Sequence, residues 1–415
     1  MTLHVCHLSS TTLESKYFNT LGRGLAARGV ALSGATLSAP DPPSWLASRD
    51  YLYLRAPSRT AYPAAILRLA RWLRQRRVTV LQTHLFDAGV VGLVAGRLAR
   101  VPLIVVTRHH SDFHFVSGTR VHVLIDSLTA RWGDRVVVLA RAVRDHLVAR
   151  EGVPSDHIDV IVQGFDFDAL GGSDEDGRRV RVELGIDDAF VVGAVAAFYP
   201  SKGHAHLFAA AAQLVREIPN LTLLLVGAGD RAAIDALAHE HGLDGRVVAA
   251  GFRRDVSACL RAMDVFVHPS LSEAFCQAII EALAAERPVV ATDVGGASEA
   301  IDDGHHGLLV PPGDADAIAR AIATLYRDPV RRRRIAEAGR RAAMARFPVD
   351  GMIDAQLDVY RRGLAPAPIT ASATNRGEHM NRHTQHARPE PVEGRARRSW
   401  FDKLTTSEAW VRRFK

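Results

Sequence analysis

Two series of short apolar runs alternate with longer helix-like segments along this 415-residue chain. The strand-like runs of the first series cover 3–8, 78–82, 103–107, 136–139 and 157–162, with helix-like segments such as 20–28 and 88–100 between them. Parallel strands need long crossover connections, which are usually helices. The alternation therefore predicts parallel β-sheets covered by helices.

The second series repeats this alternation after residue 190. Its strand-like runs cover 190–196, 221–226, 247–251, 265–269 and 288–292, and its helix-like segments cover 204–217, 232–240, 257–262, 274–285, 314–326 and 330–346. We therefore predict an α/β protein with two doubly wound, Rossmann-like domains of about equal size facing a cleft. The predicted domains are 1–168 and 169–347, and the polar, Gly-rich stretch 171–179 is the predicted linker.

The last 50 residues differ from the rest of the chain. Residues 366–415 are rich in Pro, Thr, Asn and Arg and have almost no apolar periodicity, so we predict a disordered basic tail. Part of it, 388–408, resembles a translated bacterial intergenic repeat. A tail that binds membrane or RNA is the alternative.

The charge is divided unevenly. Residues 1–168 carry 20 basic and 13 acidic side chains, 169–365 carry 22 and 27, and the tail carries 10 and 5, within a net charge of +7. The acidic second half argues against a nucleic-acid partner. Three scattered cysteines, no secretory signal and no apolar run of about 20 residues predict a cytoplasmic protein, at most peripheral to the inner face of a membrane.

The segment 264–312 carries the strongest chemical pattern. Glu273 follows the strand-like run 265–269, and Glu281 lies eight residues later in the next helix-like segment. At 3.6 residues per turn this spacing puts both carboxylates on nearly one helix face. Carboxylates accept hydrogen bonds from vicinal hydroxyls, and a helix N-terminus binds anions. The pattern therefore predicts a site for a phosphorylated sugar.

The same segment resembles the retaining glycosyltransferases of the GT-B fold, specifically glycosyltransferase family 4. Its hallmarks stand in order as SLSEAF, EALA, PVVATDVGG and GLLVPP within 270–312. The resemblance implies that Glu273 orients the donor sugar and that Glu281 binds the ribose. It also places Ala274, Phe275 and Cys276 at the donor sugar and phosphate, and returns a final helix, 348–365, to the first domain.

The resemblance extends upstream to FYPSKG, where Lys202 would bind the nucleotide diphosphate. Family members usually have an Arg five residues before this Lys, and here that position is Ala197. In LLLVGAGDR, Gly227 and Gly229 would let the backbone approach the nucleotide, and in GFRRDV either Phe252 or Arg253 would lie near the base.

The first domain resembles the family more loosely, over 81–110. His109 falls on the histidine that such enzymes direct at the transferred sugar, and we assign it a catalytic role with Glu273. His84 would lie on the acceptor side with Ser10 and Thr11, which stand where the family often has two glycines. The cluster His109, His110, Asp112 and His114 offers a metal site as an alternative, but its spacing is irregular, so we expect no metal.

Two further patterns have competing interpretations. Asp166 and Asp168 form a DxD sequence, which binds a divalent metal in another glycosyltransferase fold, although its place at the domain hinge favours a structural role. The segment 62–77 reads as an amphipathic helix with Trp72 and five arginines. It either contacts an anionic membrane or packs its apolar stripe on the sheet.

Together these features predict a retaining glycosyltransferase of the hexosyltransferase type. It would move a sugar from a nucleotide-diphosphate sugar, UDP-sugar by family default, to a saccharide or lipid-linked hydroxyl acceptor in bacterial cell-surface polysaccharide, lipopolysaccharide or glycolipid synthesis, with no cofactor. The alternatives are a sugar-nucleotide epimerase of the same fold and a non-catalytic, glycosyltransferase-like partner subunit.

Overall fold

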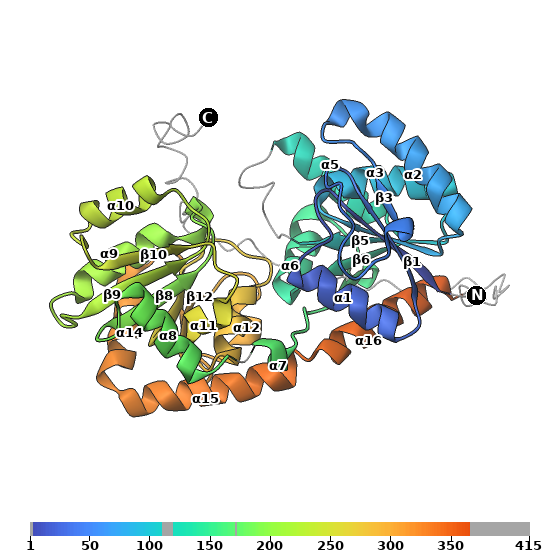
Figure 1. Cartoon of the computed structure of the whole chain (residues 1–415). Coiled ribbons are helices and arrows are strands. Elements are labelled where there is room, and N and C mark those ends of the chain that lie inside the picture. Colours follow the sequence, from blue (N-terminus) through green and yellow to red (C-terminus); the bar gives the residue numbers. More distant parts are fainter. Residues whose placement is uncertain (1–2, 110–118, 171, 366–415) are drawn as a thin grey trace, which may run out of the picture. The chain divides into compact units, whose positions relative to one another are not determined.

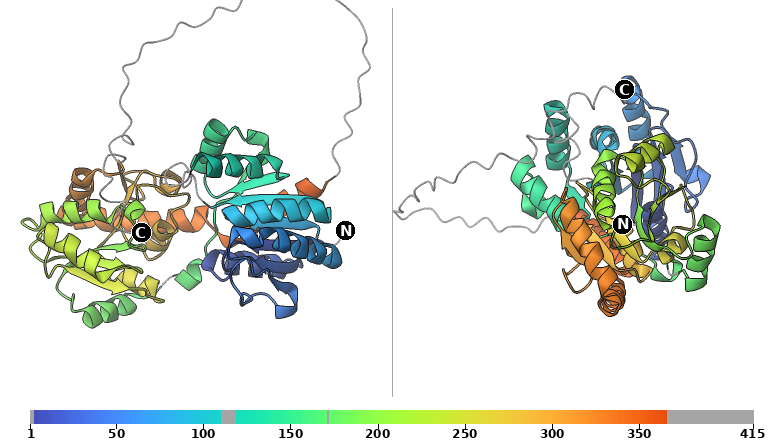
Figure 2. Two further views of the ribbon diagram at one scale, coloured as in Figure 1. Left: turned by 90° about the horizontal axis from the view of Figure 1, so that it is seen from above. Right: turned by 90° about the vertical axis from the view of Figure 1, so that its left-hand side faces the viewer.

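The computed structural model describes residues 3–109, 119–170 and 172–365, which contain two parallel sheets with helices on both faces of each sheet (Figures 1 and 2). Neighbouring strands run parallel throughout both sheets. The predicted α/β class with two Rossmann-like domains is therefore confirmed. The predicted tail, 366–415, lies outside the described residues.

The first sheet has seven strands in the order β3-β2-β1-β4-β5-β6-β7. Its strands are β1 (His4–Ser9), β2 (Ala31–Thr36), β3 (Tyr51–Tyr53), β4 (Val80–His84), β5 (Leu103–Arg108), β6 (Arg135–Val138) and β7 (Ile158–Val160). Its helices are α1 (Lys16–Ala27), α2 (Tyr62–Arg76), α3 (Phe86–Ala99), α5 (Arg120–Trp132) and α6 (Arg141–His146). The strand order reverses between β1 and β4, which is where doubly wound folds bind their ligands.

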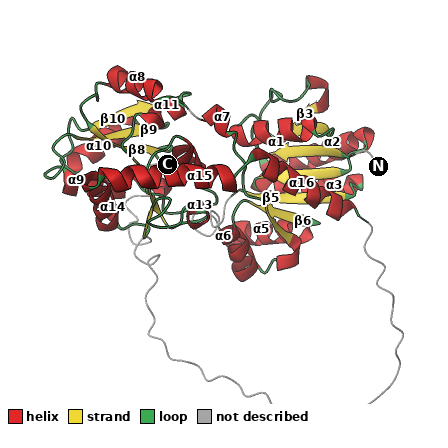
Figure 3. Ribbon diagram, turned by 90° about the horizontal axis from the view of Figure 1, so that it is seen from below, coloured by secondary structure: helices red, strands yellow, loops and turns green. Residues whose placement is uncertain are grey.

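The second sheet has six strands in the order β10-β9-β8-β11-β12-β13. Its strands are β8 (Phe190–Val195), β9 (Leu221–Val226), β10 (Val247–Gly251), β11 (Val265–His268), β12 (Val289–Thr292) and β13 (Leu308–Val310). Its helices are α7 (Phe167–Leu170), α8 (Asp174–Leu184), α9 (His204–Leu214), α10 (Arg231–Glu240), α11 (Val256–Arg261), α12 (Gln277–Ala284), α13 (Ala297–Ala300), α14 (Ala315–Arg327) and α15 (Pro329–Arg346). Figure 3 labels β8, β9 and β10 among these helices. Here the order reverses between β8 and β11.

The stretch predicted as a linker is mostly helical. Ser173 caps α8, because its hydroxyl accepts a hydrogen bond from the N–H of Asp176 while the Asp176 carboxylate accepts one from the N–H of Ser173. Three acidic residues in the first turn then favour the helix N-terminus. The polar composition that suggested a linker is thus a helix start, and the prediction was wrong from Asp174 onward.

The last described helix, α16 (Val349–Leu364), packs against the first domain, where it contacts α1 (Figure 1). Arg28, the residue directly after α1, forms ion pairs with Asp350 and Asp354 of α16. The Tyr360 hydroxyl, which is fully buried, donates a hydrogen bond to the side-chain oxygen of Gln82 in β4. A segment from the end of the described chain therefore completes the core beneath the first sheet.

Within the described residues, none of the helices combines the length and the apolar character needed to cross a bilayer.

Candidate active site

The reversal point of the second sheet brings together two predicted residues, Lys202 and Glu273. Lys202 follows β8 and Glu273 follows β11, the two strands on either side of the reversal. Lys202 Nζ lies 2.6 Å from Glu273 Oε1, and the Ser270 hydroxyl donates to the same oxygen at 2.9 Å. His268 Nε2 lies 3.3 Å away. Three groups thus converge on one carboxylate.

These neighbours decide the charge of Glu273. Burial by itself raises the pKa of this carboxyl group, but the nearby His268 ring and the charge of Lys202 outweigh that effect and lower the pKa to about 2. Glu273 is therefore an anion at neutral pH. It accepts hydrogen bonds from hydroxyl groups and does not serve as a proton donor.

Backbone geometry holds the Glu273 loop in place. Gly295, after β12, has φ of 54°, and a Cβ atom there would lie 2.2 Å from the carbonyl oxygen of Glu273. Only glycine allows this approach without strain. The N–H of Gly296 then donates to the carbonyl of Ala274 at 3.1 Å. The two glycines of PVVATDVGG thus support the loop that carries Glu273.

The segment Ala274–Cys276 is buried and leads into α12, which begins at Gln277 rather than at 274 as predicted. In the described part of the chain, the backbone N–H groups of Phe275 and Cys276 donate to no other group. They lie just before the N-terminus of α12, beside Glu273. Such groups bind phosphate oxygens.

The loop after β9 contains Gly227, whose φ is 150°. A Cβ atom at this position would lie 2.1 Å from the Ala196 carbonyl oxygen of the loop after β8. The glycine therefore lets two loops of this chain approach each other, which the sequence had suggested only for a nucleotide. A Cβ atom at Gly229 would likewise lie 2.5 Å from Cβ of Phe198.

Glu281 and Phe252, two other residues predicted to bind the donor, have very different surroundings. Glu281, 8% exposed in α12, pairs with Lys16 of α1, whose Nζ lies 2.5 Å away. Phe252 follows β10 and is 76% exposed, so its ring is available for contact. Arg253, the alternative next to it, is bound to the carboxylates of Glu183 and Asp255. Phe252 is therefore the better candidate for contact with a base.

The reversal point of the first sheet carries a row of three hydrogen-bonded histidines. His7 of β1 contacts His84 at the end of β4 through Nδ1 and Nε2, 3.1 Å apart. His84 contacts His109, just after β5, through Nδ1 and Nε2, 3.0 Å apart. Tyr17 and Phe18 of α1 cover the rings of His84 and His109.

This arrangement corrects the position predicted for His84. Its side chain is fully buried and both ring nitrogens are occupied, so it holds His109 rather than facing an acceptor. Ser10 accepts a hydrogen bond from the N–H of Ala88 in α3, and Thr11 is exposed. His7, Lys16, His268 and Ser270 had not been predicted. For His7 and His268, the position within a predicted strand is a sequence signal that could have marked them as site residues. Lys16 and Ser270 have no such signal.

The residues considered as alternative metal ligands lie around His109 and at Asp166 and Asp168. His110, Asp112 and His114 lie outside the described residues. Elsewhere in the structure, no cluster of three metal-ligating side chains is present. Asp166 accepts a hydrogen bond from the N–H of Ala169, as expected for a structural turn at the hinge.

The helix α2 turns its apolar stripe inward, burying Ala65, Leu69, Ala70 and Leu73. Of the five arginines over 62–77, three are engaged within the domain. Arg68 and Arg74 donate to backbone carbonyls of Leu54 and Leu98, and Arg76 pairs with Asp50 and stacks on Trp72. The packing interpretation therefore accounts for most of this helix. Arg71 and Arg77 are exposed.

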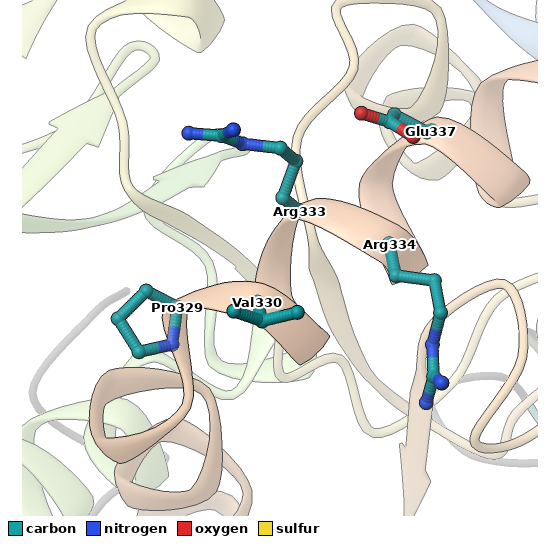
Figure 4. Close-up of a pocket in the computed structure, with 5 residues that line it drawn as sticks. All are labelled: Pro329, Val330, Arg333, Arg334 and Glu337. Atoms are coloured by element: carbon teal, nitrogen blue, oxygen red, sulfur yellow. The ribbon is translucent and has the colours of Figure 1, made fainter.

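Two surface depressions lie apart from these residues. One is lined by Pro329, Val330, Arg333, Arg334 and Glu337, all from the first turns of α15 (Figure 4). The other is an apolar groove between α3 and α5, lined in part by Val94, Leu98 and Trp132, which are 44%, 45% and 62% exposed. None of the predicted site residues lines either depression.

Two Rossmann-like domains, each with polar groups at the reversal point of its sheet, are the arrangement of the GT-B fold. Residues 177–342 match the family described as Glycosyl transferases group 1, and residues 15–169 match Glycosyltransferase Family 4. D-inositol 3-phosphate glycosyltransferase of Segniliparus rotundus is 30% identical over 393 residues, covering 86% of each chain. The chain therefore belongs to the glycosyltransferase family that these two descriptions name.

Two further similarities agree with this assignment. UDP-Gal:alpha-D-GlcNAc-diphosphoundecaprenol alpha-1,3-galactosyltransferase of Escherichia coli is 27% identical over 279 residues, covering 64% of this chain and 71% of that relative. The crystal structure of HepE from Anabaena in complex with UDP-glucose has a TM-score of 0.76 at 22% identity, covering 87% of this chain and 100% of that one. At this identity the second similarity shows the fold alone.

Proposed function

We propose that this glycosyltransferase moves a hexose from a UDP-sugar to a hydroxyl acceptor with retention of the anomeric configuration. The observation that carries the proposal is the Lys202–Glu273 pair at the reversal point of the second sheet, beside the N-terminus of α12. The E. coli relative is named for a UDP-Gal donor, and HepE was solved with UDP-glucose, which supports a uridine nucleotide.

On the donor side, each residue has a distinct chemical task. Glu273, held as an anion, would orient sugar hydroxyls by accepting their hydrogen bonds. Glu281 would bind the ribose hydroxyls in exchange for its ion pair with Lys16. Phe252 would stack on the base.

The leaving diphosphate gains negative charge as the glycosidic bond breaks. The ammonium group of Lys202 has three N–H donors, so it can keep Glu273 as one partner and bind a phosphate oxygen with another. The N–H groups of Phe275 and Cys276 would add two neutral donors. These groups would take the place of a metal ion, and we propose that none is required.

The acceptor would bind on the first domain, near His109, Ser10 and Thr11. The E. coli relative is named for a lipid-linked acceptor, which favours an acceptor of saccharide or lipid-linked type in bacterial cell-surface polysaccharide synthesis. His109 would donate a hydrogen bond to the sugar or to the developing charge.

A lipid-linked acceptor would place this cytoplasmic enzyme at the inner face of the membrane. The first domain offers two kinds of contact there. Arg71 of α2 and Arg77 directly after it are exposed charges, and the groove between α3 and α5 exposes Trp132 and Leu98. Basic and aromatic side chains of this kind favour an anionic bilayer surface.

The stereochemistry of donor hydrolysis tests the proposal. UDP-Gal and UDP-glucose are incubated with the enzyme, and proton NMR follows the released sugar before mutarotation. Retention predicts the α-anomer first, and the β-anomer first would contradict the proposal. In parallel, each donor at about 100 times its Kd should stabilise the fold by roughly 2.7 kcal/mol. Conversion of either donor to a different UDP-sugar would instead support an epimerase.

A further inference from the structure

The hydrogen bonds in the row His7–His84–His109 restrict which ring nitrogen of each histidine is protonated. The reason is that each neutral imidazole has one N–H and one lone pair. Burial lowers the pKa of His7 to about 4. The pKa of His84 lies well below its ordinary value because of burial and, secondarily, the neighbouring His109 and His7. Both rings are therefore neutral near pH 7, and each of the two contacts needs one donor and one acceptor.

Only two arrangements satisfy both contacts. In the first, His7 donates through Nδ1 to His84 Nε2, and His84 donates through Nδ1 to His109 Nε2. His109 then carries its proton on Nδ1. In the second, every donor is reversed, so His109 donates from Nε2 and His7 must carry its proton on Nε2.

The surroundings of His7, at the buried end of the row, distinguish the two proton arrangements. His7 is 1% exposed, and among the residues that the structure describes its Nε2 atom has no hydrogen-bond partner. Folded proteins leave a buried acceptor without a donor more often than a buried N–H without an acceptor. The first arrangement places a lone pair at this position and the second places an unsatisfied N–H there, so the first is favoured.

We propose that His7 and His84 are positioning residues which fix His109 in the tautomer that carries its proton on Nδ1. His109 then presents an N–H donor, which suits hydrogen bonding to a sugar hydroxyl or to a developing negative charge. The kinetic part of this inference rests on the proposed function, while the tautomer itself does not.

The backbone around the row is fixed at both strand ends. Leu85, directly after His84, has φ of 73° and ψ of 164°, a conformation that side-chain-bearing residues rarely adopt. Arg108, directly before His109, is buried and bound to Glu151 at 2.5 Å and to Asp126. Such fixed backbone limits rotation of the two rings.

The row orients His109 but does not conduct protons. If His109 lost its Nδ1 proton and received another through His84, His7 would have to give up its only ring proton. Its Nε2 atom has no partner among the described residues from which to take a replacement, so His7 would become an anion in a buried site. That outcome is strongly unfavourable, and the row therefore acts as a closed chain.

Nitrogen-15 NMR of the full chain tests the tautomer directly. The protein is labelled with 15N-histidine, and the His109 resonances are assigned by their loss in His109→Asn. At a pH near 8 we expect His109 Nδ1 to show the shift of a protonated ring nitrogen and Nε2 that of an unprotonated one. The opposite assignment would overturn the proposal whatever the enzyme's activity.

A pair of substitutions at His7 tests the cause. In His7→Asp the carboxylate only accepts, so the row should reverse, moving the His109 proton to Nε2 and lowering kcat by about 100-fold with the donor KM nearly unchanged. His7→Asn keeps an N–H donor in a similar volume and should retain the wild-type tautomer and most of kcat. Equal losses in both variants, with the same His109 tautomer, would exclude the positioning role. If His7→Asp does not fold, the wild-type spectrum still decides.

Discussion

Lys202 Nζ and Glu273 Oε1 lie 2.6 Å apart, although 71 residues separate them in the chain. The pair joins the loops after β8 and β11, the strands between which the second sheet reverses its order. It keeps a carboxylate charged and a lysine fixed at the place where a nucleotide sugar would lose its diphosphate. Each partner should therefore be required for the reaction.

Replacing either partner should abolish most activity. Glu273→Gln removes the anion that orients the sugar, and Lys202→Met removes the charge that stabilises the leaving group. We expect each to lower kcat for donor hydrolysis and transfer by about 100- to 1000-fold. Asp235→Asn, which breaks the exposed Arg231–Asp235 pair on α10, is the matched control and should leave kcat unchanged. Wild-type rates in Glu273→Gln would exclude this carboxylate from catalysis.

Removal of divalent metals should not affect the enzyme. In the proposed mechanism, Lys202 and the N–H groups before α12 would supply the positive potential that a metal supplies in other transferases. Transfer rates should be the same, within error, after dialysis against EDTA and after addition of Mg²⁺ or Mn²⁺. A loss on dialysis that either ion restores would instead point to a metal site, and the His109–His114 region would be its first candidate.

The free energy of unfolding should decrease as the pH falls below about 6.5, the ordinary pKa of histidine. Burial, and secondarily the charge of Lys202, lowers the pKa of His204 to about 4. Above about pH 6.5 this ring is neutral in both the folded and the unfolded state. Between about pH 6.5 and 4 the unfolded chain binds a proton that the folded chain does not, so the free energy of unfolding decreases. Below about pH 4 both states bind it and the loss stops.

The size of this effect is measurable by urea unfolding at about pH 7.5 and about pH 5. His204→Gln cannot titrate, so its free energy of unfolding should decrease by about 2 kcal/mol less than that of the wild type. His239 is 84% exposed in its side chain, and His239→Gln should follow the wild type. If all three proteins lose stability equally, His204 titrates normally in the folded state.

Binding to anionic vesicles should depend on the first domain. Reversing the exposed Arg71 and Arg77 to Glu should weaken binding to phosphatidylglycerol vesicles at least tenfold, since each basic residue contributes about 1 kcal/mol near such a surface. Trp132→Ala should weaken it further by removing an apolar contact. The control reverses Arg333 and Arg334 of α15 in the same way (Figure 4). Equal losses in both double variants, measured by vesicle co-sedimentation, would show nonspecific attraction.

The fold could be predicted from the sequence, and Glu273 and Glu281 could be expected near each other, because both follow from local patterns. Buried parallel strands are continuous apolar runs, and the SLSEAF segment keeps Glu273 and Glu281 within one strand–loop–helix unit. The short strands β2 and β3 were missed because Ala31–Thr36 has few β-branched residues and Tyr51–Tyr53 spans three residues. Neither reaches the length or composition that marks a strand.

What the sequence could not supply were contacts between distant segments. His7 lies in β1, His84 ends β4 and His109 follows β5, so their row exists only once these three strands are adjacent. Lys16 and Glu281 are 265 residues apart, and no periodicity relates them. The choice between the two interpretations of 62–77 depends on similar contacts, because Arg68 and Arg74 donate to carbonyl groups of other segments.

The hydrogen bond from Tyr360 to Gln82 bears on how the protein is made. A ribosome synthesises the first sheet early, but the helix that closes one of its faces emerges only after about 350 residues have been joined. Until then Gln82 and Leu103 lack their final cover from α16. Domains generally fold in order of synthesis, yet this first domain must wait for the second to be translated. A nascent chain stalled before Val349 should therefore remain sensitive to protease in its earliest part.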